Sequence, residues 1–191
     1  MNDGEIRVPV CGLRLALAGC AAAIALMAAA WAIYPGGYDW LNRDLSTLGR
    51  VFTVNGLGHH VNFSVYNFGL LVWGMSTLAF FLGAAMAAAT PRAARRMLIA
   101  GVMTGLGLAG IGITPADVPN NLWHVVSSST AILGFAIAVF ATPREEQSGR
   151  RFWVWSLAAA AVFYLLLRIC RIPHGSEIFQ KLFVLYVYSY V

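Results

Sequence analysis

The chain has 191 residues, of which 59% are hydrophobic and 11% are charged, and its mean hydropathy is +0.70. Soluble domains carry about 25% charged residues, so this composition excludes a water-soluble globule and indicates an integral membrane protein. The net charge of +5 does not indicate nucleic-acid binding, because the arginines fall in short loops between apolar runs and form no basic stripe. The three cysteines show no ligand spacing, and we infer no disulfide.

Six apolar runs approach the length of about 20 residues that a helix needs to cross a bilayer. The runs are continuously apolar and do not alternate, which favours helices over a β-barrel. We therefore predict a single all-α domain, residues 1–191, built as a polytopic transmembrane helical bundle of about six helices. The expected spans are 12–33, 63–89, 97–114, 122–142, 152–170 and 177–191.

The first run has two features of processed leader segments, Leu-Ala-Gly-Cys at 17–20 and Ala-Trp-Ala at 30–32. Arg14 interrupts the apolar run before Cys20, and the stretch from Leu15 to Ile33 is longer than the apolar part of a cleaved leader. We expect the segment to remain as a helix.

Basic residues divide unevenly between the two sides of the predicted bundle. The N-terminal tail and the 90–97 and 142–151 loops hold eight of them, and the opposite loops and helix ends hold five. Cytoplasmic loops carry the excess of Lys and Arg, so we predict that both termini are cytoplasmic in a multi-pass protein of the inner (cytoplasmic) membrane. All four histidines then fall at the outer ends of the spans.

The connection between the first two spans, residues 34–62, is too polar for lipid and rich in specific groups. Its turn Tyr34-Pro35-Gly36-Gly37-Tyr38 is expected to set aromatic rings at headgroup level. Asp44 or Ser46 is expected to cap a short interfacial helix by accepting from its free backbone N–H groups. We predict that this segment forms an interfacial lid over an outward-facing polar cavity ringed by Arg168, Asp117, His124 and Glu177.

Gly101 and Gly105 lie four residues apart in the third span. This small-xxx-small spacing allows helix backbones to approach closely, and it places the helix in the centre of the bundle. The alternative use of the two glycines is a homo-oligomer contact.

Arg168 and Arg171 lie three residues apart and share one face of the fifth span. Three interpretations remain open for them. They form an ion pair with Asp39, Asp44, Asp117 or Glu177, they bind a lipid phosphate, or they snorkel to the headgroups.

The histidines raise the question of a metal site, because imidazole and carboxylate groups bind zinc and lower the pKa of a bound water. His59, His124 and His174 stand at three helix ends that can converge, with Asp44 or Asp117 to complete the shell. No HxxxH or HExxH pairs two of them on one helix face, so the simpler interpretation is interfacial histidines bonded to loop carbonyls. Ser46 lacks a Gly-x-Ser-x-Gly elbow. Asp44, Ser46 and His124 are the catalytic candidates if the protein is an enzyme.

Taken together, several short motifs resemble a family of prokaryotic membrane proteins of about six helices that is known as a domain of unknown function. The motifs are Asp44-Leu45-Ser46-Thr47-Leu48-Gly49, an Asn at the start of the second span (Asn62 or Asn67), Pro115-Ala116-Asp117, His124, and Gly175-Ser176-Glu177. The serine follows Asp44 by two residues and not by the family's three. The resemblance covers almost the whole chain and implies a fold and a membrane, without an activity.

A weaker resemblance is to the alkaline ceramidase and adiponectin-receptor membrane hydrolases, which use Ser, Asp and three His around zinc. Those proteins pair two His on the last of seven helices, and this chain has no such pair.

We therefore expect a binding protein for a lipid or another amphiphilic small molecule, with membrane lipids as partners and no cofactor assured. The alternative is a lipid-acting membrane enzyme, such as a metal-dependent hydrolase that uses His and Asp at its outer face. The predicted ligand-binding residues are Arg168, Arg171, Asp117, Glu177, His60 and Asn121.

Overall fold

The computed structural model describes residues 10–40, 42–50, 60–88, 90–115, 121–141, 158 and 181–182. This part of the chain forms α1 (Val10–Ala32), the short 3₁₀ helix η1 (Leu45–Gly49), α2 (His60–Met86), α3 (Pro91–Ile113) and α4 (Leu122–Ala141). No strand occurs among these residues, which confirms the all-α class for them. The predicted spans 152–170 and 177–191 lie outside the described residues apart from positions 158, 181 and 182.

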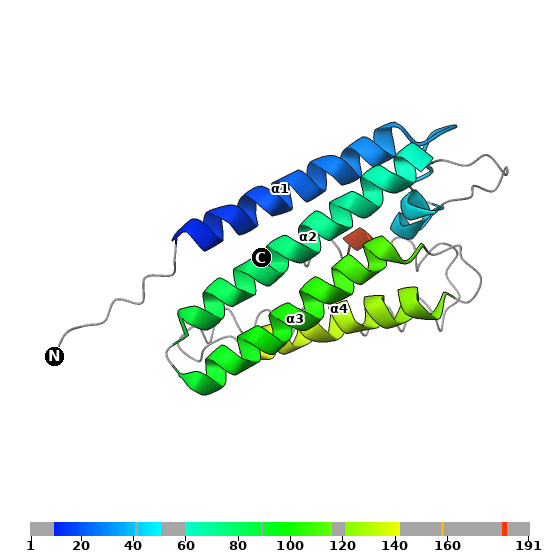
Figure 1. Cartoon of the computed structure of the whole chain (residues 1–191). Coiled ribbons are helices and arrows are strands. Elements are labelled where there is room, and N and C mark those ends of the chain that lie inside the picture. The colour runs from blue at the N-terminus through cyan, green and yellow to red at the C-terminus, as the bar shows by residue number, and fades with distance from the viewer. Residues whose placement is uncertain are drawn as a thin grey trace.

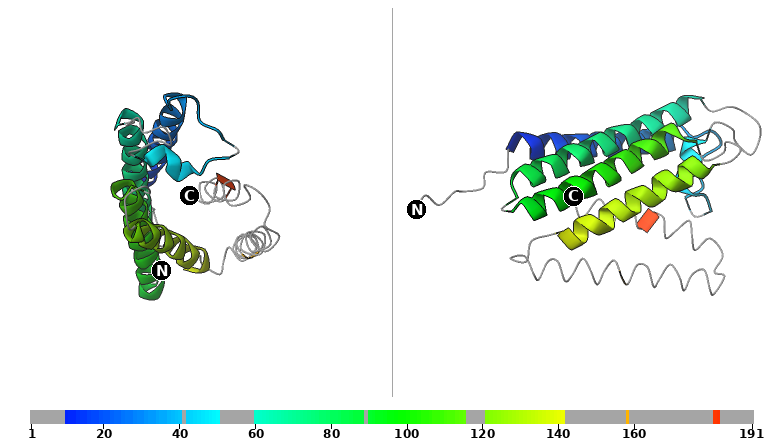
Figure 2. Two further views of the ribbon diagram at one scale, coloured as in Figure 1. Left: turned by 90° about the vertical axis from the view of Figure 1, so that its right-hand side faces the viewer. Right: turned by 60° about the horizontal axis from the view of Figure 1, so that its bottom comes forward.

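The four long helices alternate in direction and pack in chain order, α1 on α2, α2 on α3 and α3 on α4 (Figure 1). Seen along the helices they form a curved row, and η1 lies on its concave side (Figure 2, left). We name the two ends of the bundle by their contents: the η1 end, where α1 and α3 finish, and the arginine end, where α3 begins. Among the described helices, α2 lies between α1 and α3, and α3 lies between α2 and α4. The central place of α3 in the whole bundle stays a prediction.

Three of the helices are long and apolar enough to cross a membrane, over Arg14–Ala32, Val61–Met86 and Pro91–Ile113. α4 has 20 residues, which gives a length of about 30 Å, close to the thickness of the hydrocarbon core. Large apolar side chains stand exposed along all four helices, including Ile24, Phe68, Leu106 and Leu133. Such a surface suits lipid as the solvent, so the fold indicates an integral membrane protein.

α3 begins six residues before the predicted start of its span, and Thr90 and Pro91 explain the difference. The Thr90 side chain accepts a hydrogen bond from Ala93 N at 3.2 Å, and Pro91 occupies the first turn, where its missing N–H is not needed. Residues 91–97, which we expected to be part of a loop, therefore form the first turns of α3. Three exposed arginines of these turns lie at the arginine end: Arg92, Arg95 and Arg96.

The end of α1 is set by Pro35, Gly36 and Gly37. Proline does not continue a helix, and both glycines adopt positive φ angles, 76° and 82°, that favour glycine. The chain thus turns over Tyr34–Gly37, where Gly37 N donates to the Tyr34 carbonyl at 3.0 Å, and continues toward η1.

The helix α3 approaches both of its described neighbours through glycines. A Cβ placed on Gly105 would lie 2.8 Å from Gly74 O of α2, and one placed on Gly107 would lie 2.5 Å from Ala131 N of α4. Both distances are too short for a real side chain, so backbone meets backbone on two sides of α3. Gly101 and Gly105 both face α2 of the same chain, in keeping with the packing role that we expected first for them.

We predict that Gly105→Ala lowers the stability of the detergent-solubilised protein by about 1–3 kcal/mol, because the added methyl group overpacks the α2–α3 contact. Gly83→Ala is the matched control, since a Cβ at that α2 position meets nothing within 4 Å. It should be neutral or stabilising, as alanine is the better helix former. Thermal melting of both variants checks this, and equal melting temperatures would contradict the close contact.

Candidate functional site

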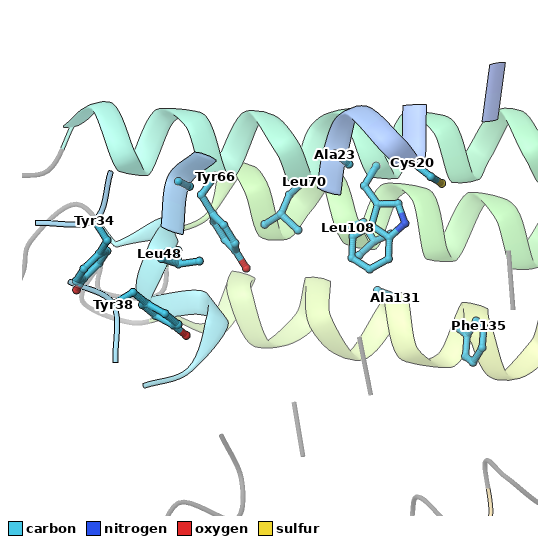
Figure 3. Packing of buried hydrophobic residues seen from close by; sticks show 12 residues of the cluster. Cys20, Ala23, Tyr34, Tyr38, Leu48, Tyr66, Leu70, Leu108, Ala131 and Phe135 are labelled. Carbon is cyan, nitrogen blue, oxygen red and sulfur yellow. The ribbon is translucent and has the colours of Figure 1, made fainter. Parts of the chain in front are cut away.

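A cluster of buried aromatic and aliphatic side chains joins η1 to the long helices. Tyr34, Tyr38, Leu48 and Tyr66 are all at most 8% exposed and belong to one hydrophobic cluster with Leu70. Figure 3 shows Tyr66 of α2 between Leu48 of η1 and Leu70, which lies deeper in the bundle. The two tyrosines that we expected at headgroup level are therefore buried in the protein. Exposed aromatic rings at this end include Trp123 at the start of α4 and the pair Trp31 and Trp40, whose centroids lie 5.3 Å apart.

η1 is the short helix that the Asp44-Leu45-Ser46 pattern predicts, and Asp44 occupies its N-cap. The predicted side-chain cap is wrong, because Asp44 makes no capping hydrogen bond through its carboxylate. Its backbone carbonyl instead accepts from Thr47 N at 2.9 Å and closes the first turn. Ser46 sits inside η1 and does not cap it.

η1 rests directly on α2 because its last residue has no side chain. A Cβ on Gly49 would lie 2.6 Å from Asn67 Oδ1 and 2.8 Å from the Tyr66 ring. About one turn nearer the start of α2, Asn62 Nδ2 donates to the carbonyl of Ala30 and ties α2 to α1. These contacts give a structural role to Gly49, Asn62 and Asn67, three residues of the motifs described above.

Lys181, the chain's single lysine, is 3% exposed and fastens the α1–α2 connection. Its ammonium group donates to the carbonyls of Trp40 and Arg43, the second at 2.7 Å. It also lies 5.2 Å from the centre of the Trp40 ring and 5.9 Å from that of Tyr38, within range of a cation–π interaction. A buried cation held by carbonyls and ring faces keeps much of the stabilisation that water would give it.

The carbonyl of Arg43 accepts a second hydrogen bond, from the Tyr38 hydroxyl at 2.8 Å. The Arg43 side chain turns back to donate to the Tyr34 hydroxyl at 2.6 Å. Burial, followed by the nearby Asp44 carboxylate, raises the pKa of Tyr38 above its ordinary value. The phenol therefore keeps its proton and remains a donor at neutral pH.

A cavity of about 150 Å³ lies between η1 and the concave face of the four long helices. Its described walls are mainly apolar, with Leu70 and Trp73 from α2, Leu108 and Ile111 from α3, and Phe135 from α4. Polar side chains gather toward the η1 end, where Ser46, His124 and Ser128 line it. Along α4 the lining runs from His124 to Phe135, twelve residues or about 16 Å of helix.

His124 is held by a hydrogen bond between its Nδ1 and the carbonyl of Thr114, at 2.7 Å. A carbonyl only accepts, so Nδ1 carries the proton and Nε2 of the neutral ring is left with its lone pair. The simpler interpretation of this histidine, a hydrogen bond to a loop carbonyl, is thereby the observed one. Ser128 Oγ is engaged by its own helix, donating to the carbonyl of His124 at 2.8 Å.

The structure brings together two of the predicted site residues, Ser46 and His124, in the wall of one cavity. Asp44 immediately precedes η1, and Asn121 is exposed just before α4. His60 is the first residue of α2, and its side chain is outside the described part. The remaining predicted site residues also lie outside it: Arg168, Arg171, Asp117, Glu177, His59 and His174. Among described residues, no three His, Cys, Asp or Glu side chains gather as metal ligands.

Sequence reasoning missed Lys181, Tyr66, Trp73 and Thr104. Lys181 was counted only as a positive charge near the outer face, although its being the single lysine among thirteen basic residues was a usable signal. The other three lie in apolar helices, where no local pattern separates a cavity wall from an ordinary packing position.

Comparison with known proteins finds a family that covers most of the chain. The family described as "Protein of unknown function (DUF998)" matches residues 17–176. No curated protein and no solved structure matches the chain.

We predict that Lys181→Met destabilises the protein by about 1.5–3 kcal/mol, the usual worth of hydrogen bonds to a charged group. Methionine keeps most of the stem but leaves the carbonyls of Trp40 and Arg43 without their ammonium donor. Leu182→Met, at the adjacent and 52% exposed position, is the control and should be silent. Equal melting temperatures for Lys181→Met and the wild type would show that the hydrogen bonds of the Lys181 ammonium group do not stabilise the protein.

Proposed function

The chain belongs to the DUF998 family of proteins of unknown function, and we propose that it is an integral membrane protein that binds a lipid or another amphiphilic small molecule in this cavity. The observation that supports the proposal is the order of groups along the cavity wall. The lining extends about 16 Å along α4, with hydrogen-bonding side chains toward its η1 end and mostly apolar and aromatic side chains nearer the bundle centre, where Thr104 is the polar exception. An amphiphile presents the same order, a polar head followed by an apolar tail.

The cavity volume limits how much of the ligand enters. An engineered apolar cavity of 150 Å³ takes up benzene, and pockets for whole drug-sized molecules measure about 300–1,000 Å³. A cavity of about 150 Å³ therefore fits one ring or a short stretch of a single chain, with the rest of the ligand outside it. A two-chain phospholipid enters with one chain end only.

The chemistry of the described lining favours a head held by hydrogen bonds. It contains no Lys, Arg, Asp or Glu, and His124 is its one titratable imidazole. Recognition of a charged head by Arg168, Arg171, Asp117 or Glu177 is part of the proposal and involves residues outside the described part. The hydrolase alternative is supported by one observation, that Ser46 and His124 line the same cavity, with Nδ1 of the histidine bonded to the Thr114 carbonyl.

We propose the inner (cytoplasmic) membrane as the location, with the η1 end outside. The support is the cluster of exposed Arg92, Arg95 and Arg96 at the opposite end, because arginine collects on the cytoplasmic side.

The binding proposal is tested with a palmitic acid that carries a photoreactive diazirine in its chain. We expect it to label Ala131 and Leu108, which line the cavity and are at most 8% exposed, so that bulk lipid cannot account for the label. Ser128→Phe places a ring in the cavity and should reduce this labelling about tenfold, equivalent to about 1.4 kcal/mol of binding free energy. Mass spectrometry of the cross-linked peptides is the measurement.

Ser129→Phe is the matched control, since it makes the same change at the next residue, which is exposed and does not line the cavity. It should label like the wild type. Label confined to exposed positions, or equal loss in both variants, would refute binding in the cavity.

Orientation is tested by single cysteines introduced into a chain whose own cysteines are replaced by alanine. Cysteine at the exposed Asn42 or Asn121 should react with an impermeant thiol reagent added to intact cells. Cysteine at Ala94, among the arginines of α3, should react only after the cells are opened. The reverse pattern would place the η1 end in the cytoplasm.

A further inference from the structure

Thr104 of α3 is a buried hydroxyl in the wall of the cavity. The residue is 3% exposed, and its Oγ1 has no hydrogen-bond partner in the part of the chain that the structure describes. It stands ten residues before Thr114, the residue that holds His124, and thus about 15 Å deeper in the bundle. Burying a hydroxyl without a partner is unfavourable, so its position requires a reason.

Four other Ser and Thr hydroxyls of the described residues satisfy themselves locally, whereas Thr77 of α2 shares the unpaired state of Thr104. Those of Ser76, Thr114, Ser128 and Thr130 each donate to the carbonyl four residues earlier, at 2.7–2.8 Å. This bond is the ordinary solution for Ser and Thr in an apolar helix. Thr104 does not make it, and its hydroxyl is directed elsewhere.

Gly134 of α4 makes the space for this hydroxyl. A Cβ on Gly134 would lie 2.6 Å from Thr104 Oγ1, so any larger residue would collide with it. The next residue, Phe135, lines the cavity together with Thr104 and Trp73. The hydroxyl therefore lies at a close α3–α4 contact, opposite Gly134, and Thr104 shares the cavity wall with two aromatic side chains.

We propose that Thr104 selects ligands whose apolar portion carries an oxygen atom, a hydroxyl or a carbonyl, over ligands with a plain hydrocarbon chain. The proposal rests on the binding function proposed above and specifies the class of amphiphile. A threonine hydroxyl both donates and accepts, so it pairs with either kind of oxygen. A ligand that supplies this oxygen satisfies the buried hydroxyl of Thr104, and a plain chain leaves it unpaired.

A bound water is the competing occupant, and the chemistry of the described wall disfavours it. A buried water needs two to four polar partners, and beside the Thr104 hydroxyl the neighbouring lining residues Trp73, Leu108 and Phe135 offer only one more polar group, the indole N–H of Trp73. An oxygen attached to an apolar chain needs one partner only, because its carbon neighbours suit the aromatic wall.

Thr104→Val is the test variant, since it removes the hydroxyl and keeps the shape. Thr77→Val is its matched control, because Thr77 is 1% exposed, its Oγ1 likewise has no described partner, and it does not line the cavity. Replacing an unpaired buried hydroxyl with a methyl group is neutral or stabilising, so both variants should melt at or above the wild-type temperature. A lower melting temperature for Thr104→Val alone would show a structural hydrogen bond and overturn the proposal.

Ligand selection is measured by competition against the photoreactive palmitic acid. Stearic acid and a stearic acid hydroxylated near the middle of its chain are the two competitors. In the wild type and in Thr77→Val, the hydroxylated acid should displace the label at about two- to tenfold lower concentration, the worth of one neutral hydrogen bond. In Thr104→Val the two acids should compete equally, and Thr104→Ser should restore the preference.

The outcomes separate the two proposals. Label at Ala131 with no preference between the acids in the wild type, or a preference that survives in Thr104→Val, overturns the role of Thr104 and leaves binding in place. Absence of label from the cavity in the wild type overturns the proposed function itself.

Discussion

The closeness of α3 to both of its neighbours is the constraint on which the described structure depends. Lipid is as apolar as the helices, so burial of apolar surface does little to hold helix against helix, and close packing must do it. Glycines let the α3 backbone touch α2 at Gly74 and α4 at Ala131. Where the facing residues are larger, as at Leu108 and Ile111, the helices and η1 leave the cavity. The distribution of small and large residues along α3 therefore determines both its close contacts with α2 and α4 and the position of the cavity.

The η1 end adds polar connections to this apolar frame. A backbone carbonyl in a loop is hard to satisfy near lipid, and here the carbonyl of Arg43 accepts from both the Tyr38 hydroxyl and the Lys181 ammonium group. Tyr38, which donates to this carbonyl, and Tyr34, which accepts from the Arg43 side chain, also belong to the buried apolar cluster. The same few side chains thus anchor the connection and seal the bundle, which keeps Ser46 of η1 at the cavity wall.

Local signals in the sequence predicted local structure well. Pro35 with two following glycines marked the end of α1, the apolar runs marked α1 to α4, and Asp44 marked the start of η1. The predicted start of α3 was six residues too late, because we assigned its arginines to a loop. Arg92, Arg95 and Arg96 are instead exposed side chains of the first turns of the helix. The inward turn of Tyr34 and Tyr38 and the hydroxyl of Thr104 depend on partners distant in the chain. Ser46 and His124 were recognised singly, and only the fold shows that they share a cavity.

The contact between Lys181 and Trp40 joins residues that are 141 positions apart. Closing so long a loop is entropically costly and slow compared with forming a helical hairpin. A chain made from its N-terminus inserts α1 to α4 long before residue 181 leaves the ribosome. Until then the carbonyls of Trp40 and Arg43 remain without their ammonium donor and the η1 end stays incomplete. A residue far along the chain therefore completes the connection between α1 and α2, and a chain that terminates before residue 181 lacks the ammonium donor of that connection.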